Sequence, residues 1–211
     1  MAARTQEHSP EKAWLLRAFL VLQSPRAVFA AIRDDSDESA HVRAESVLAV
    51  VWLTGISAVL ASPAMNNVMD DPARDAVVVA IILFIGGGLY GFVAYFILSA
   101  ILHGCVRALG SQGTFRRTRH LFAFATAPVA LALPTFWVVR IAIEGKDLFK
   151  YGGSDTGHVF ADAFYVFVAW TVVLALIGVR TIHGWSWPRA GVAVAVATTA
   201  ATLLVLWTSV L

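Results

Sequence analysis

The stretch AVVVAIILFIGGGLYGFVAYFILSAILHGCV, residues 76–106, contains no Asp, Glu, Lys or Arg. An α-helix rises 1.5 Å per residue, so about 20 mostly apolar residues cross the roughly 30 Å hydrocarbon layer of a bilayer. The stretch is longer than one crossing requires. It therefore predicts a membrane-spanning helix that either tilts or projects beyond the bilayer.

The composition of the whole chain supports a membrane location. Hydrophobic residues make up 58% and charged residues 14% of the 211 residues, and the mean hydropathy is +0.71. A soluble domain carries about 25% charged and about 45–50% apolar residues. This chain has too little polar surface to face water on all sides, so we expect an integral membrane protein.

Other apolar runs on both sides of the opening stretch are also long enough to cross a bilayer. The alternation VAVAVA at 192–197 looks strand-like, but an unpaired strand would leave its backbone groups unsatisfied in lipid. We therefore predict an all-α fold, a five-transmembrane-helix bundle over residues 44–211, preceded by an N-terminal segment of residues 1–43. The predicted spans are 44–62, 76–106, 121–139, 159–179 and 190–211.

The basic residues predict the orientation of the bundle. Twelve of the sixteen Lys and Arg residues fall before the first span or in the loops after the second and fourth spans. An excess of Lys and Arg marks the cytoplasmic face, so we expect the N-terminus inside and the C-terminus outside. The chain has thirteen Arg and three Lys. This usage, with abundant Ala and Val, is typical of GC-rich bacterial genes and favours a bacterial plasma membrane.

The N-terminal segment predicts two amphipathic helices. Residues 13–22, AWLLRAFLVL, place apolar side chains at helical spacing with basic residues able to meet headgroups. Residues 24–35, SPRAVFAAIRDD, place Ser at a cap position and Pro in the first turn of a second helix. Two interpretations remain open, packing under the bundle and a regulatory role at the membrane surface.

Between the second and third spans the sequence turns cationic, in GSQGTFRRTRHLFAFATAPVALALPTFW, residues 110–137. Gly110 and Gly113 permit a tight turn because glycine tolerates positive φ. Pro128 and Pro134 each remove a backbone donor, so we expect bends that are either structural or line a cavity. The basic cluster is either a topological anchor in the headgroups or a contact site for a partner, and its candidate residues are Arg107, Arg116, Arg117 and Arg119. A nucleic-acid site is disfavoured, because two turns of basic residues offer little reading surface.

Small residues recur at helical spacing in two spans. Gly87 and Gly91 form one face and Gly191 and Ala195 another, and such faces allow close helix packing. The packing can be within one chain or across a homodimer.

Few ionisable groups fall inside the predicted spans. Asp162 lies near the outer end of the fourth span, where either a structural ion pair with Arg140 or a functional role explains it. His103 has no second ligand at helical spacing and Cys105 has no partner cysteine, so we predict no metal site, no cofactor and no disulfide.

Three segments resemble the Yip-domain family of five-span membrane proteins with a cytoplasmic N-terminus. They are SPRAVFAAIRDD, RALGSQGTFRRTRHLFAFATAP (107–128) and IGVRTIHGWSWPRA (177–190). The resemblance covers roughly residues 24–206, with Ser111 where the family has a glycine. The chain lacks the Asp-Leu-Tyr-Gly-Pro segment of eukaryotic members, so their small-GTPase partners do not carry over.

The resemblance implies a membrane scaffold or accessory subunit that organises a partner protein or a lipid. No nucleophile–base set, HExxH or phosphate loop occurs, so we predict no enzyme activity. The expected partners are the lipid bilayer and another membrane protein or a second copy. The alternative is a transporter or permease subunit, although five spans do not divide into two inverted halves and transport would require a dimer or a partner.

Overall fold

The structure, a computed structural model, describes residues 19–62, 65, 68, 75–145 and 159–210. Every regular element within these residues is a helix. In chain order the elements are α2 (Pro25–Ala31), α3 (Asp37–Leu60), α5 (Ala76–Ile81), η1 (Ile82–Gly86), α6 (Gly87–Ala108), α7 (Phe115–Ala125), α8 (Ala127–Ala132), η2 (Leu133–Trp137), α9 (Val138–Glu144), α10 (Val159–His183) and α11 (Trp187–Val210). The elements η1 and η2 are π-helical.

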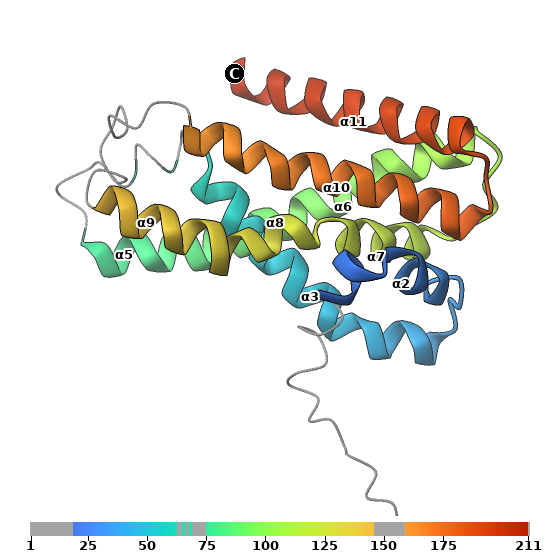
Figure 1. The fold of residues 1–211 in the computed structure, drawn as a ribbon, viewed down its shortest axis with the longest axis horizontal. Coiled ribbons are helices and arrows are strands. Elements are labelled where there is room, and N and C mark those ends of the chain that lie inside the picture. Colours follow the sequence, from blue (N-terminus) through green and yellow to red (C-terminus); the bar gives the residue numbers. More distant parts are fainter. Residues whose placement is uncertain (1–18, 63–64, 66–67, 69–74, 146–158, 211) are drawn as a thin grey trace, which may run out of the picture.

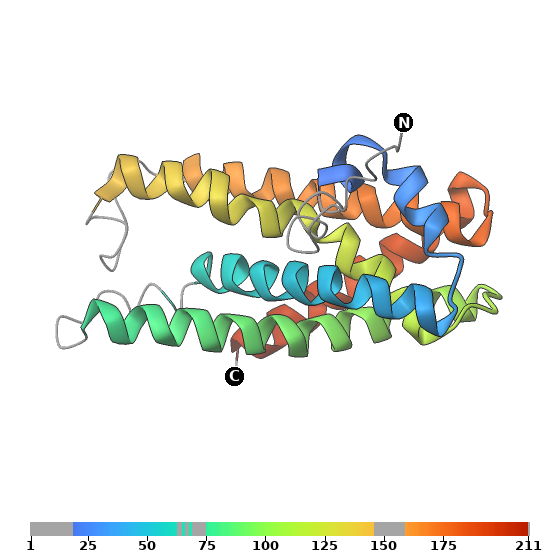
Figure 2. The ribbon, with the colours of Figure 1, turned by 90° about the horizontal axis from the view of Figure 1, so that it is seen from below.

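The long helices run side by side along the longest axis of the molecule (Figure 1). Seen from below, α10 lies beside the segment from α7 to α9, and α3 lies beside the segment from α5 to α6 (Figure 2). The turns at 109–114 and 184–186 lie at one end, near α2. We call this the arginine end, because it carries the basic residues of positions 107–119 and 180–189.

Four helical segments are long and apolar enough to cross a membrane by length and composition. They are Asp37–Leu60, Val77–Ala108, Phe115–Glu144 and Asp162–His183. The prediction of an all-helical membrane protein is therefore confirmed, with four candidate spans among the described residues. The fifth predicted span corresponds to the 24-residue helix α11, and its crossing of the membrane stays a prediction.

Helices α3 and α6 cross at glycines. A Cβ atom added to Gly55 would lie 2.2 Å from the carbonyl oxygen of Gly87 and 2.5 Å from the Cα atom of Gly91. Real Cβ atoms do not approach backbone atoms so closely, so the two helices lie together only because these positions carry no side chain. Gly87 and Gly91 are thus placed in a close helix contact within one chain, and Gly55 is the partner that the sequence pattern did not indicate.

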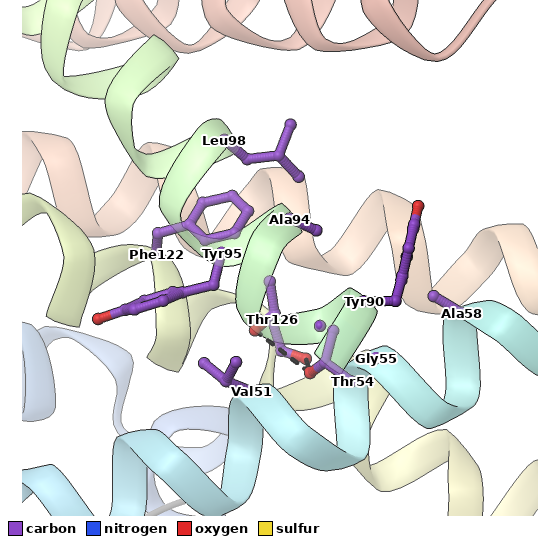
Figure 3. A pocket seen from close by; sticks show the side chains of 11 residues that line it. Val51, Thr54, Gly55, Ala58, Tyr90, Ala94, Tyr95, Leu98, Phe122 and Thr126 are labelled. Atoms are coloured by element: carbon purple, nitrogen blue, oxygen red, sulfur yellow. Dashed lines mark hydrogen bonds between the residues drawn. The ribbon is translucent and has the colours of Figure 1, made fainter. Parts of the chain in front are cut away.

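A small cavity of about 120 Å³ lies beside this crossing. Figure 3 shows its lining, in which side chains of α3 and α6 lie near Phe122 and Thr126 of the third span. Thr54 donates a hydrogen bond to the carbonyl oxygen of Thr126 at 3.3 Å. Sites for drug-sized ligands have volumes of about 300–1,000 Å³. This cavity is too small for one, so we treat it as a packing gap at a three-helix junction.

The third span is interrupted where the prolines predict bends. Helix α7 ends at Ala125, and α8 begins at Ala127 with Pro128 in its first turn. Pro134 lies in the π-helical segment η2, where the hydroxyl of Thr135 donates to the carbonyl oxygen of Leu131 at 2.6 Å. Proline leaves a carbonyl without its usual donor, and local π geometry or a hydroxyl group accommodates the loss.

The helix that contains the first predicted span begins at Asp37, ahead of the predicted boundary at residue 44, and where the membrane begins along this helix stays a prediction. Ala195 is exposed, and a Cβ added to Gly191 would meet no atom within 4 Å, so neither residue packs closely within the chain, and their packing across a homodimer stays a prediction. Among the α11 side chains that the structure describes, Ala190, Ala193, Val194 and Ala197 are buried. Small residues occupy most sides of this helix, so the pattern alone did not identify the packed side.

Candidate functional site

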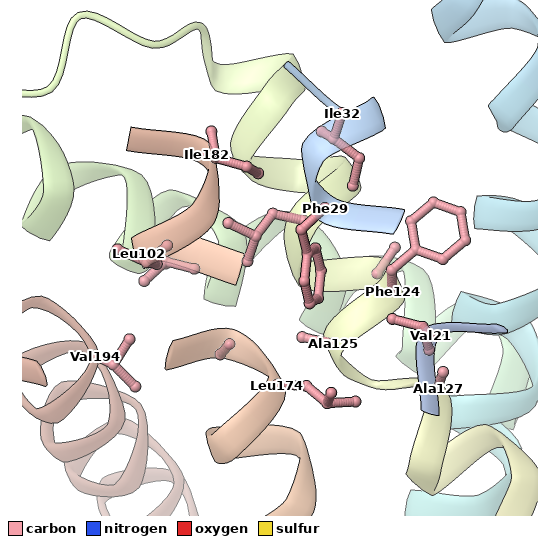
Figure 4. Close-up of a cluster of buried hydrophobic side chains, with 14 of the residues drawn as sticks. Val21, Phe29, Ile32, Leu102, Phe124, Ala125, Ala127, Leu174, Ile182 and Val194 are labelled. Atoms are coloured by element: carbon pink, nitrogen blue, oxygen red, sulfur yellow. The ribbon is translucent and has the colours of Figure 1, made fainter. Parts of the chain in front are cut away.

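Helix α2 is built into the bundle at the arginine end. Phe29 is fully buried and Ile32 is buried, and Figure 4 shows both side chains pointing into the cluster that contains Leu174 and Ile182 of α10. A Cβ added to Gly178 would lie 3.1 Å from the Phe29 ring, so α10 passes close beneath α2. This arrangement corresponds to packing under the bundle, the first of the two predicted roles. The predicted helix over 13–22 lies mostly outside the described residues, although residues 19–23 are helical.

An acidic linker, which we define as residues 34–36 together with Asp37 at the start of α3, follows α2 and binds the start of α7. Arg116 forms salt bridges with Asp35, at 2.9 Å from Nε to Oδ1, and with Asp37, at 2.5 Å from Nη1 to Oδ1. The hydroxyl of Thr114 also donates to Asp35, and it accepts from the backbone N–H of Arg117 at 3.1 Å as the N-cap of α7. One carboxylate thus fixes both the cap and the first basic residue of the third span.

Two further arginines connect backbone carbonyls across the same end. Arg117 donates from Nη2 to the carbonyl oxygen of Arg33 at 2.9 Å. Arg33 in turn donates from Nε to the carbonyl oxygen of Thr181 near the end of α10 at 3.0 Å. These bonds connect the N-terminal segment to the third and fourth candidate spans. Together with the acidic linker they form what we call the inner clamp, made by Arg33, Asp35, Asp37, Thr114, Arg116, Arg117 and Thr181.

The carboxylates of the linker are held in their charged form. The Ser39 hydroxyl and the Ser36 backbone N–H donate to Asp34 and lower its pKa to about 2. Burial of the Asp35 carboxyl opposes ionisation, but hydrogen bonds from Thr114 and Arg116 outweigh it, so the pKa of Asp35 is lowered from its ordinary value. Both shifts come from donors that stabilise a carboxylate.

Arg119 and Arg107 differ from the clamp arginines. The guanidinium of Arg119 lies over the rings of Phe96 and Phe115, with its Cζ 5.0 Å and 5.2 Å from the ring centroids. Neither Arg119 nor the exposed Arg107 forms a hydrogen bond or ion pair through its side chain with a residue that the structure describes. The four predicted contact residues therefore divide into two that bind other segments of the protein through hydrogen bonds and ion pairs and two that form neither with the described residues.

The turn before α7 uses its glycines in different ways. Gly110 has φ +90°, a conformation that favours glycine, whereas Gly113 is not among the described glycines with positive φ. Gly113 instead lies in a crowded place, where an added Cβ would be 3.3 Å from both His183 Cε1 and Ser111 Oγ. The Ser111 hydroxyl lies 3.2 Å from His183 Nδ1 and accepts from the Gly113 N–H at 3.0 Å. Gly113 therefore does not use the positive φ that glycine tolerates, and close packing explains the residue.

The last turn also carries aromatic–cation pairs that the sequence did not predict. Arg180 lies over Trp187 and Arg189 over Trp185, each with Cζ 4.3 Å from the ring centroid. Arg189 also donates to the carbonyl oxygen of Leu109, which connects the two turns at the arginine end. The sequence feature that could have predicted them is HGWSWPR, residues 183–189, in which two Trp residues stand close to an Arg.

At the opposite end, the predicted pair of Arg140 and Asp162 is replaced by another. Arg140 forms its salt bridge with Glu144, at 2.8 Å from Nε to Oε2, one turn along the same helix. Its guanidinium also lies over Trp137 and Phe160. Asp162 is exposed. The predicted end of the third span at residue 139 puts Glu144 in a loop, so the sequence pattern does not indicate this pair spaced by four residues.

The described residues hold no group of three or more His, Cys, Asp or Glu that could bind a metal ion. The polar groups at the arginine end hold protein segments together, and they can also present cations to a partner or a headgroup. A family model described as Yip1 domain matches the chain over residues 19–210. No curated protein and no solved structure shows a significant match to the chain.

Proposed function

The chain belongs to the Yip1 domain family, and from that premise we propose that it is a non-catalytic membrane scaffold or accessory subunit that holds a partner protein or a lipid at its arginine end. It is an integral membrane protein with several apolar helices. We further propose that the arginine end faces the cytoplasm of a bacterial cell, as the excess of Lys and Arg at this end predicts.

The inner clamp is the observation that carries this proposal. A scaffold needs a surface that is formed before its partner arrives, because ordering a surface during binding weakens the complex. The Asp35 side chain is only 9% exposed, and Arg116 and Thr114 hold it from a second segment of the chain. The N-terminal segment and the start of α7 therefore form one ordered polar surface.

The packing of the bundle favours scaffolding over transport. Most of the buried residues in the described bundle are apolar, with Phe124, Leu121, Leu174 and Val106 among them, and the buried histidine and acidic residues there are His120 and Glu144. Ionisable residues that serve transport usually face the bundle interior or a water-filled cavity. Since the interior at these residues is filled by hydrocarbon side chains, a partner-holding role explains the structure better than a substrate path.

Site-specific photo-crosslinking in intact cells tests the proposal. A photoreactive amino acid is placed at Gln112 and at Glu38, which are exposed at the arginine end, and at Val159, which is exposed at the opposite end as the matched control. We expect a discrete protein adduct or a lipid adduct from the first two positions and not from Val159.

Two results would contradict the scaffold role. One is the same set of adducts from all three positions, which would mean random collision. The other is substrate uptake by vesicles that contain only this protein, which would instead support the transporter alternative.

A further inference from the structure

One side of α6 forms an apolar stripe that runs toward Arg119 and Arg107. Leu89, Val93 and Phe96 are exposed at spacings of three and four residues, so they share one side of the helix. We call these three residues the α6 stripe. Continuing the same spacing toward the arginine end leads to His103 and then to the exposed Arg107. The stripe belongs to a candidate membrane span, so it faces the hydrocarbon of the bilayer.

Helix α7 brings a second cation to the end of this stripe. The Arg119 guanidinium lies over Phe96, which is the last residue of the α6 stripe, and over Phe115. His103 packs against the same Phe115 ring, with 5.4 Å between ring centroids, and its Nδ1 lies 3.1 Å from the Thr118 hydroxyl. These contacts place a guanidinium and an imidazole at one short section of the α6–α7 interface, and Arg107 follows His103 by one turn of α6.

We infer that this section binds an anionic phospholipid of the inner leaflet, with its phosphate at Arg119 and Arg107 and an acyl chain along the α6 stripe. Charge complementarity carries the choice of ligand. Arg116 and Arg117 have acceptors within the protein, whereas Arg119 and Arg107 form no hydrogen bond or ion pair with the described residues. A guanidinium donates two parallel hydrogen bonds to a phosphate, and the two aromatic rings hold that of Arg119 in place.

The apolar stripe selects a lipid over a soluble phosphate. A free phosphate or a phosphopeptide could bind the two arginines, but neither would contact the exposed Leu89 and Val93, which lie in the candidate membrane span. The inference deepens the proposed scaffold role, on which it rests, because it names the lipid that the arginine end would hold.

Native mass spectrometry of the full chain in mild detergent tests the site. The probe is phosphatidylglycerol in equimolar competition with phosphatidylcholine of the same acyl chains, and the variants are Arg107→Gln, Arg119→Gln and the double substitution. The matched control is Arg26→Gln, an exposed arginine of α2. Each interfacial arginine attracts an anionic leaflet by about 1 kcal/mol, so we expect phosphatidylglycerol affinity to fall about fivefold per substitution and about 30-fold for the double variant. Arg26→Gln should leave it unchanged, and glycerol phosphate without acyl chains should not compete.

Three results would overturn the inference: double-variant affinity within twofold of the wild type, an equal loss in Arg26→Gln, or full competition by glycerol phosphate. Arg107 is exposed, so Arg107→Gln decides the matter even where the Arg119 variants fail to fold. Lost lipid selectivity in Arg107→Gln together with unchanged protein adducts from Gln112 would support the lipid site and leave the partner site intact. If Arg107→Gln keeps its lipid selectivity but loses the protein adducts from Gln112, the lipid site would be overturned and the partner site would not.

Discussion

Adding one methyl group at the glycine crossing should separate α3 from α6. In Gly55→Ala the new Cβ would meet three backbone atoms, the Gly87 carbonyl oxygen at 2.2 Å and the Gly91 Cα and N atoms at 2.5 and 2.6 Å. An ordinary van der Waals contact begins at about 3.4 Å, so one helix must move by about an ångström. Backbone atoms cannot rotate aside as a flexible side chain can. The whole crossing therefore has to open.

The size of the effect follows from two opposing contributions. Alanine is favoured over glycine inside a helix by about 1 kcal/mol. Overpacking in a filled interior costs about 1–3 kcal/mol, and a gap of 0.5–1 Å forfeits a quarter to a half of each contact along the α3–α6 interface. We expect Gly55→Ala to lower the free energy of unfolding by about 1–2 kcal/mol. We expect a loss toward the upper end of that range, because the added Cβ would lie only 2.2 Å from a backbone atom, the carbonyl oxygen of Gly87.

Reversible unfolding of the purified protein in mild detergent measures this difference. Gly104→Ala is the matched control, because Gly104 lies in α6 and an added Cβ there would meet no atom within 4 Å. The control should be neutral or slightly more stable than the wild type. If Gly55→Ala is as stable as Gly104→Ala, the helices do not cross as closely as the structure describes.

Three further predictions concern the inner clamp and the topology. Asp35→Asn should lower the free energy of unfolding by about 1.5–3 kcal/mol, because the Asp35 side chain is 9% exposed and its carboxylate accepts hydrogen bonds from Arg116 and Thr114. The Asp37 side chain is 95% exposed, so Asp37→Asn should lower the free energy of unfolding by less than about 1 kcal/mol. Equal losses in the two variants, measured by the same unfolding assay, would contradict the clamp. The pKa of Asp35 is lowered in the folded state from an ordinary 3.8, so its contribution is complete above that pH and is lost as pH falls through the lower folded-state value. An acid unfolding curve should therefore lose part of its pH dependence below about pH 4 in Asp35→Asn, and an unchanged curve would refute this. A reporter after Leu211 should read outside and one at Gln112 inside, while both on one side would mean that α11 does not cross the membrane.

The helical elements could be predicted because charge-free apolar runs have few alternatives in lipid. Residues 76–106 form α5, η1 and nearly all of α6, and the prolines at 128 and 134 coincide with a helix break and a π-helical segment. Gly87 and Gly91 stood out by their spacing of four. Gly55 did not, because a single glycine within α3 forms no pattern.

The arginine end could be predicted only as a location. The sequence shows the basic residues of 107–119, but it does not show which groups accept their hydrogen bonds, since Asp35 lies 81 residues from Arg116 along the chain. A sequence pattern reports neighbours on one helix, and it does not report which helices meet. The same limit explains α11, where both the exposed and the packed sides carry small residues.

The contacts that the N-terminal segment makes with residues far along the chain can form only after those residues have been synthesised. At roughly 5–20 residues per second, a ribosome takes about 4–16 s to extend the nascent chain from Asp35 to Arg116. It takes about 7–30 s to pass from Arg33 to its acceptor at Thr181, which lies 148 residues later. Throughout that interval Phe29 and Ile32 have no α10 to cover them. The nascent chain therefore carries an apolar helix, α2, that α10 does not cover until the fourth candidate span has been made.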